Sequence, residues 1–139
     1  MISLLLVLSS SRIHRRHHRY EPNSIGDSIV KYARSKVGST CKELSTGPDW
    51  YDWSGLAQWC HNQVGISIPA SAGLQASHGE RVPLDSLQPG DLIIFQNSKL
   101  WYQVGIYSGN NMMIYASEPN SIVRETPLKY LRLWGRRYW

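Results

Sequence analysis

The side chains best suited to nucleophilic chemistry in this 139-residue chain are the thiols of Cys41 and Cys60. A thiol attacks as the thiolate, and a hydrolase needs a base, most often a histidine, that accepts the proton and later returns it. His61 adjoins Cys60, but sequence neighbours on a helix point about 100° apart and do not form a dyad. His78 lies in a Ser-His-Gly segment typical of a solvent-facing loop. Neither cysteine therefore has an evident base.

The cysteines and histidines also lack the spacing of a metal site. No C-x-x-C pair is present, and no metal or other cofactor is expected. Two cysteines are enough for one disulfide, and the sequence leaves open whether they lie close enough to form it. His14, His17 and His18 form a histidine-rich tract for which adventitious metal binding is expected.

The first half of the chain is predicted to be helical. Apolar residues recur at helical spacing over residues 25–37, where Ser24 or Asp27 can cap the start and Gly38 ends the helix. Residues 69–77 are rich in small side chains and predict one or two helical turns.

A second helix is predicted over residues 53–64, with Asp52 as its N-cap and Gly65 at its end. Cys60 lies on nearly the same helix face as Trp53, but about 10 Å further along the axis. It is therefore expected to be a small buried core residue that faces the sheet, away from the positive end of the helix dipole.

The second half of the chain is predicted to be β. The turn Pro89-Gly90-Asp91 leads into it, and Gly109-Asn110-Asn111 predicts a hairpin turn because Gly and Asn tolerate positive φ. Helices followed by strands are typical of the α+β class. The expected strands are 92–95, 101–107, 112–116, 121–125 and 130–134.

Five sequence segments occur in a specific order along the chain. They are TGPD (46–49), YDWSGL (51–56), GISIP (65–69), LQPGDLIIF (87–95) and QVGIYSGNNMMIYA (103–116). This order resembles the NlpC-type family of papain-like peptidases, which cut the stem peptides of bacterial peptidoglycan. The resemblance covers about residues 24–139. It implies one domain over that range, with N-terminal helices packed on an antiparallel sheet of about five strands.

The resemblance also locates three catalytic positions, and each is changed. The family's cysteine nucleophile corresponds to Trp53, its histidine to Gln103, and the residue that orients the histidine to Tyr115. An indole offers no nucleophile, and an amide does not titrate near neutral pH, so it cannot shuttle a proton. The chain is therefore expected to be a pseudoenzyme that hydrolyses nothing.

The departures extend beyond these positions. The family's Tyr-Val-Trp-Gly-Gly type stretch is replaced by CKELS at residues 41–45, and the basic residue usual after Pro69 by Ala70. Because the scaffold turns are kept, the chain is expected to bind the wall stem peptide or to regulate wall hydrolysis. Trp53 is large enough to fill part of the cleft. The candidate cleft residues are Asp52, Trp53, Ser54, Gly55, Ser71, Tyr102, Gln103, Val104 and Tyr115.

One alternative is a residual peptidoglycan hydrolase with a non-standard nucleophile. Cys41 is one candidate, since the resemblance places it in a cleft-side loop where exposure is expected. Ser54, at the start of the second helix, is the other, although a serine depends on a base more than a thiol does.

A second alternative rests on a basic leader, residues 1–23, which is predicted to be disordered. Arg12, Arg15, Arg16 and Arg19 supply four of the net +5 charges, and such a segment can bind nucleic acid, anionic lipid or an acidic wall polymer. No specific nucleic-acid motif accompanies it. The apolar run at 2–8 precedes its positive charges, unlike a secretory signal. A secreted or wall-associated location is therefore implied by the resemblance alone.

Overall fold

The computed structural model describes residues 24–42, 47, 50–96, 99, 101–116, 120–128 and 132–139. The basic leader, with its arginines and histidines, lies outside this part, as does most of CKELS and TGPD. The helices are α2 (Ile25–Ser35), α3 (Trp53–Gln63), α4 (Ala72–Ser77) and the 3₁₀ turn η1 (Leu84–Ser86). The strands are β1 (Thr40–Cys41), β2 (Trp50–Tyr51), β3 (Glu80–Val82), β4 (Leu92–Gln96), β5 (Tyr102–Gly109), β6 (Met112–Ala116), β7 (Val123–Pro127) and β8 (Arg132–Arg137).

The main sheet has six strands in the order β3-β8-β4-β5-β6-β7, and every neighbouring pair is antiparallel. The predicted α+β fold is confirmed. The sheet has one strand more than expected, because β3 is only three residues long and carries two exposed charged residues. β1 and β2 form a separate parallel pair. No helix among the described residues is long and apolar enough to cross a membrane.

Local signals set the helix starts and the hairpin turn as predicted. Ser24 caps α2 by accepting a hydrogen bond from the Asp27 N–H at 3.2 Å, and Asp52 caps α3 by accepting one from the Gly55 N–H. Asn110 and Asn111 have φ of 52° and 60°, the left-handed conformation expected of the hairpin between β5 and β6.

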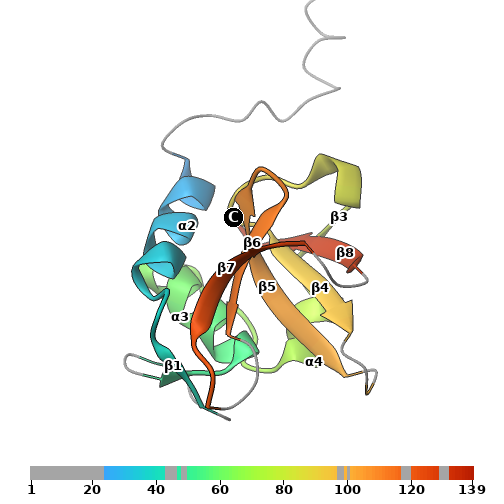
Figure 1. The fold of residues 1–139 in the computed structure, drawn as a ribbon. Coiled ribbons are helices and arrows are strands. Elements are labelled where there is room, and N and C mark those ends of the chain that lie inside the picture. Colours follow the sequence, from blue (N-terminus) through green and yellow to red (C-terminus); the bar gives the residue numbers. More distant parts are fainter. Residues whose placement is uncertain are drawn as a thin grey trace, which may run out of the picture.

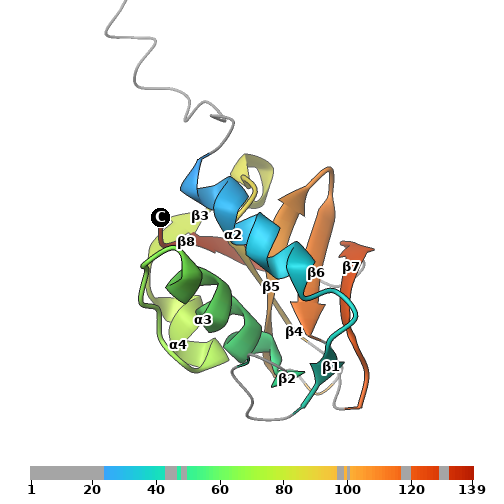
Figure 2. The same ribbon diagram turned by 90° about the vertical axis from the view of Figure 1, so that its left-hand side faces the viewer.

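Helices α2 and α3 pack against one face of the sheet (Figures 1 and 2). A second, smaller cluster covers the opposite face. The helix-side core includes Ile29, Val30, Ala33, Leu56, Ala57, Cys60, Ile94, Val104, Ile106, Ile114 and Ala116. The second cluster contains Ile93, Phe95, Met113 and Tyr115. Alternating residues of β4, β5 and β6 thus pack into two apolar clusters, one on each face of the sheet.

The start of α2 lies directly against the turn before β4. A Cβ atom on Gly26 would collide with the carbonyl oxygen of Pro89 and lie 2.7 Å from Cζ2 of Trp139. Gly90 has φ +96° and meets the backbone of Gly26 in the same way. Only glycine at both positions allows this approach.

Replacing Gly26 with alanine is therefore expected to lower the free energy of unfolding by about 1–3 kcal/mol, because backbone must move to admit the methyl group. Gly73 in α4 is the matched control, since nothing lies within 4 Å of its added Cβ. Gly73→Ala should be neutral or stabilising by up to about 1 kcal/mol. Urea unfolding of both variants measures the difference, and equal stabilities would contradict the close approach.

Candidate functional site

The first turn of α3 is where the sequence places the nucleophile position. Trp53 is the first residue of this helix and is half-buried. Ser54 and Gly55 beside it are buried, and the Ser54 hydroxyl donates to Oδ1 of Asp52 at 3.2 Å. The helix N-terminus is therefore built and capped as a nucleophile would need, but it carries an indole instead of a thiol.

Gln103 and Tyr115 lie on neighbouring strands and share one face of the sheet. Gln103 pairs with Phe95 of β4, and continuing the β5–β6 register from Ile106–Ile114 by one pair sets Tyr115 opposite Gly105. Gln103 and Tyr115 are only 7% and 6% exposed. The Tyr115 ring packs edge-on against Phe95, with centroids 5.9 Å apart. The two positions are thus brought together, diagonally across β5 and β6.

The body of α3 packs against the other face of the same strands. Leu56 and Ala57 lie in the helix-side core with Val104 and Ile106. Because side chains alternate along β5, Gln103 points away from that core. The Val104 side chain, a candidate for the cleft, is therefore packed in the interior.

Two further cleft candidates, Tyr102 and Ser71, lie at the surface of the protein. Tyr102, at the start of β5, is 41% exposed and contacts Trp134 edge-on. Ser71 is exposed and caps α4 by accepting a hydrogen bond from the Leu74 N–H at 3.3 Å. Its hydroxyl thus has a structural role at the start of α4.

Gln75 is a site residue that the sequence reasoning missed. Its Nε2 donates to the carbonyl of Ser54 at 2.9 Å and to that of Pro69 at 2.8 Å. This buried amide therefore ties α4 to the first turn of α3. It lies in a stretch of small residues, and no local pattern marks it.

The expected exposure of Cys41 is wrong. Cys41 is 1% exposed in β1, where its N–H donates to Ser121 O at 2.8 Å and its carbonyl accepts from the Asn120 N–H at 3.1 Å. Pairing with residues distant in sequence buries this strand. Cys60 is fully buried as predicted, and burial raises the pKa of its thiol strongly. Both cysteines are free, so no disulfide joins them.

His61 is fully buried and neutral. Its Nδ1 donates to the Ala57 carbonyl at 2.8 Å, and its ring meets Tyr138 edge-on with centroids 6.0 Å apart. Burial lowers the pKa of His61 to about 4. His78 is exposed, as predicted. Within the described ranges, no group of three or more His, Cys, Asp or Glu could hold a metal ion.

Stability should consequently fall on acidification. His61 becomes protonated below pH 6.5 in the unfolded chain, but only below about pH 4 in the folded chain. Because the unfolded state binds the extra proton between these values, the free energy of unfolding falls as the pH is lowered through this window. The loss attributable to His61 is up to about 3 kcal/mol. Denaturant unfolding at several pH values should show a shallower decline for His61→Gln than for the parent chain. His78→Gln is the exposed control, and a decline that also flattens in this variant would contradict the assignment.

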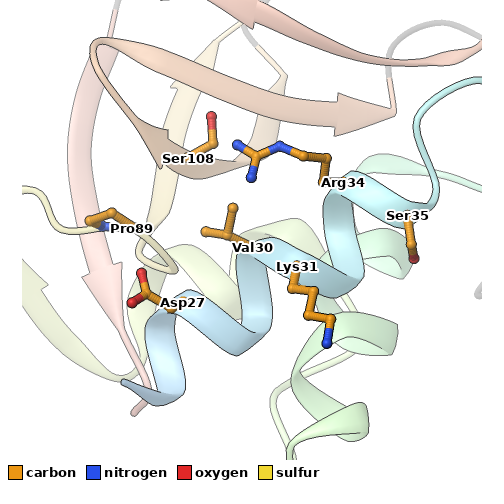
Figure 3. Close-up of a pocket in the computed structure, with 7 residues that line it drawn as sticks. All are labelled: Asp27, Val30, Lys31, Arg34, Ser35, Pro89 and Ser108. Carbon is orange, nitrogen blue, oxygen red and sulfur yellow. The ribbon is translucent and has the colours of Figure 1, made fainter. Parts of the chain in front are cut away.

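A pocket of about 510 Å³ lies between α2, the turn before β4 and the end of β5 (Figure 3). Arg34 borders it and is held by a bidentate ion pair with Glu125 at 2.9–3.1 Å. The residues that line this pocket are Asp27, Val30, Lys31, Arg34, Ser35, Pro89 and Ser108. None of the candidate cleft residues lines it.

Comparison with known proteins shows that the chain is similar to the NlpC/P60 family. The profile of the NlpC/P60 family matches residues 40–139. A probable endopeptidase of Corynebacterium glutamicum is 40% identical over 108 residues, which are 78% of this chain and 51% of the relative. A probable endopeptidase of Mycobacterium tuberculosis is 34% identical over 100 residues, 72% of this chain and 26% of the relative. The chain thus spans about half or less of the length of these relatives.

Solved structures agree with the sequence comparison. The structure of NlpC2 from Trichomonas vaginalis superposes with a TM-score of 0.79 at 30% identity, covering 87% of this chain and 49% of that one. An NlpC/P60 family protein from Bacillus cereus gives a TM-score of 0.77 at 27% identity, with coverages of 84% and 41%. The similarity covers helices and sheet together.

Proposed function

Because the chain belongs to the NlpC/P60 family, we propose that it is a catalytically inactive member of it that binds wall stem peptide without cleaving it. One observation carries this proposal: indole, amide and phenol side chains stand at Trp53, Gln103 and Tyr115, the three positions that the family resemblance assigns to catalysis. The capped helix start and the neighbouring strands that hold these positions are kept. A role in regulating wall hydrolysis would follow if the chain competes with active relatives for the same peptide.

The rival proposal, a residual hydrolase, needs another nucleophile beside a base. Cys41 is buried in β1, and the buried thiol of Cys60 holds its proton tightly. Ser54 donates its hydroxyl proton toward the Asp52 carboxylate, which is a weak base and is already engaged as the helix cap. These surroundings favour binding over turnover.

The groups left at the site suit peptide recognition. An amide both donates and accepts hydrogen bonds, so Gln103 can pair with a peptide group without transferring a proton. Tyr102, the preceding residue of β5, is exposed but points to the other face of the sheet, where it contacts Trp134. Trp53 at the start of α3 is half-buried, and we expect its indole to limit how deeply a ligand enters.

Titrating a synthetic peptidoglycan stem tetrapeptide into ¹⁵N-labelled protein tests the proposal. We expect amide shifts at Ser54, Gln103 and their neighbours, an intact peptide at the end, and binding about tenfold weaker in Gln103→Ala. Gln63→Ala, an exposed change at the end of α3, is the matched control. Shifts confined to the α2 pocket, or equal affinities of the two variants, would overturn the site. Peptide cleavage would overturn the inactivity.

A further inference from the structure

Two arginines lie directly opposite each other on β3 and β8. Arg81 pairs with Arg136 in the antiparallel register. Like charges in this position repel, and such pairs are destabilising unless something offsets them. The Arg136 guanidinium donates to the carbonyls of Ala76 at 2.7 Å and Gly79 at 3.2 Å. Across the stretches of chain that the structure describes, no carboxylate pairs with either arginine.

The half-buried Trp134 joins these arginines to the exposed ring of Tyr102. The Arg81 guanidinium lies over the Trp134 ring, 5.1 Å from its centroid. The indole Nε1 shares the Ala76 carbonyl with Arg136, at 3.0 Å. Tyr102 meets Trp134 edge-on across β4, with centroids 5.9 Å apart, and is 41% exposed. Arg81, Tyr102, Trp134 and Arg136 therefore form one continuous aromatic–arginine patch centred on Trp134.

We propose that the aromatic–arginine patch binds an acidic glycan whose sugar rings carry carboxylate groups. The C–H face of a sugar ring is slightly positive and is attracted to the negative face of an aromatic ring. A guanidinium matches the planar fork of a carboxylate. Arg81 and Tyr102 contact the same indole, so they lie close together. The ligand must therefore carry its carboxylate within about one sugar unit of the ring that contacts Tyr102. A bound carboxylate would also offset the repulsion between Arg81 and Arg136.

Other anionic polymers fit this arrangement less well. A polyol phosphate has an acyclic repeat and offers no ring for Tyr102 or Trp134. A single-stranded nucleic acid needs a groove lined by cations along several nucleotides, whereas this patch has two cationic side chains. The patch shares Tyr102 with the candidate cleft residues but uses neither Trp53, Gln103 nor Tyr115. The Arg81→Gln variant therefore tests glycan binding separately from the Gln103→Ala variant, which tests stem-peptide binding.

Calorimetric titration with tetragalacturonate tests the proposal, with neutral chitotetraose, polyglycerol phosphate and an oligodeoxythymidine of similar charge as comparison ligands. We expect tetragalacturonate to bind most tightly and more weakly at high salt. Arg81→Gln and Tyr102→Ala should each weaken the binding of tetragalacturonate by about tenfold. Arg136 is not substituted, because its guanidinium also binds the Ala76 carbonyl at the end of α4.

The control variants remove the same groups from elsewhere on the surface. Arg124→Gln deletes an exposed arginine of β7, and Tyr32→Ala an exposed aromatic of α2. Both should bind tetragalacturonate within about twofold of the parent chain. The proposal is overturned if the parent does not bind tetragalacturonate, if any comparison ligand binds as tightly, or if Arg81→Gln behaves like Arg124→Gln.

Discussion

Replacing Arg137 with methionine is expected to lower the free energy of unfolding by about 3–5 kcal/mol, because it leaves a buried carboxylate without its partner. Asp91, which follows the turn before β4, is 0% exposed. Its two oxygens accept hydrogen bonds from Nε and Nη2 of Arg137 at 2.7 and 2.8 Å, and the Gln88 N–H donates to it at 2.8 Å. Chemical denaturation at pH 7 measures the loss.

The Arg34–Glu125 ion pair provides the matched control. It has the same bidentate geometry, but the Arg34 side chain is exposed, so Arg34→Met should cost about 0–1 kcal/mol. Similar losses for the two arginine variants would contradict the role of burial. Without Arg137, the pKa of Asp91 should rise further, and the deficit of the variant should shrink as the pH falls and the carboxyl becomes neutral.

Restoring the thiol and the imidazole together should create peptidase activity. In Trp53→Cys/Gln103→His, the new cysteine would lie at the N-terminus of α3, where the helix dipole favours a thiolate. We expect weak turnover of stem peptide, about 10²- to 10⁴-fold below an intact triad, because Tyr115 orients an imidazole poorly. Tyr115→His added to this pair should raise the rate.

The control for this experiment is Trp53→Ala/Gln103→His, which opens the same space without a nucleophile. Mass spectrometry after exposure to a thiol-directed acylating substrate analogue should show one adduct on the cysteine variant and none on the alanine variant. A folded cysteine variant that neither acylates nor turns over peptide would show that the catalytic positions have been misplaced.

Most of the fold follows from local signals in the sequence. The caps at Ser24 and Asp52 and the left-handed Asn110-Asn111 turn act over three or four residues, so the sequence reveals them directly. The apolar runs of β4 and β6 likewise predict buried strands. The family resemblance added the order of the elements and the three catalytic positions.

Features that depend on distant partners could not be predicted. Cys41 is buried because its strand pairs with residues 120–122, some 80 positions away. The Asp91–Arg137 pair and the Gly26–Gly90 approach join segments that share no local pattern. Gln75 supports the first turn of α3 from another helix. Each of these is a tertiary contact, and a single sequence carries no periodicity that reports it.

The central claim is that this NlpC/P60 domain does not hydrolyse its family's substrate. Incubating the purified chain with peptidoglycan and identifying the released muropeptides by mass spectrometry tests it most directly, with the triple variant Trp53→Cys/Gln103→His/Tyr115→His as the positive control. We predict release by the triple variant and none above buffer by the parent chain. Turnover by the parent chain that is abolished by Cys41→Ala or Ser54→Ala would contradict the claim.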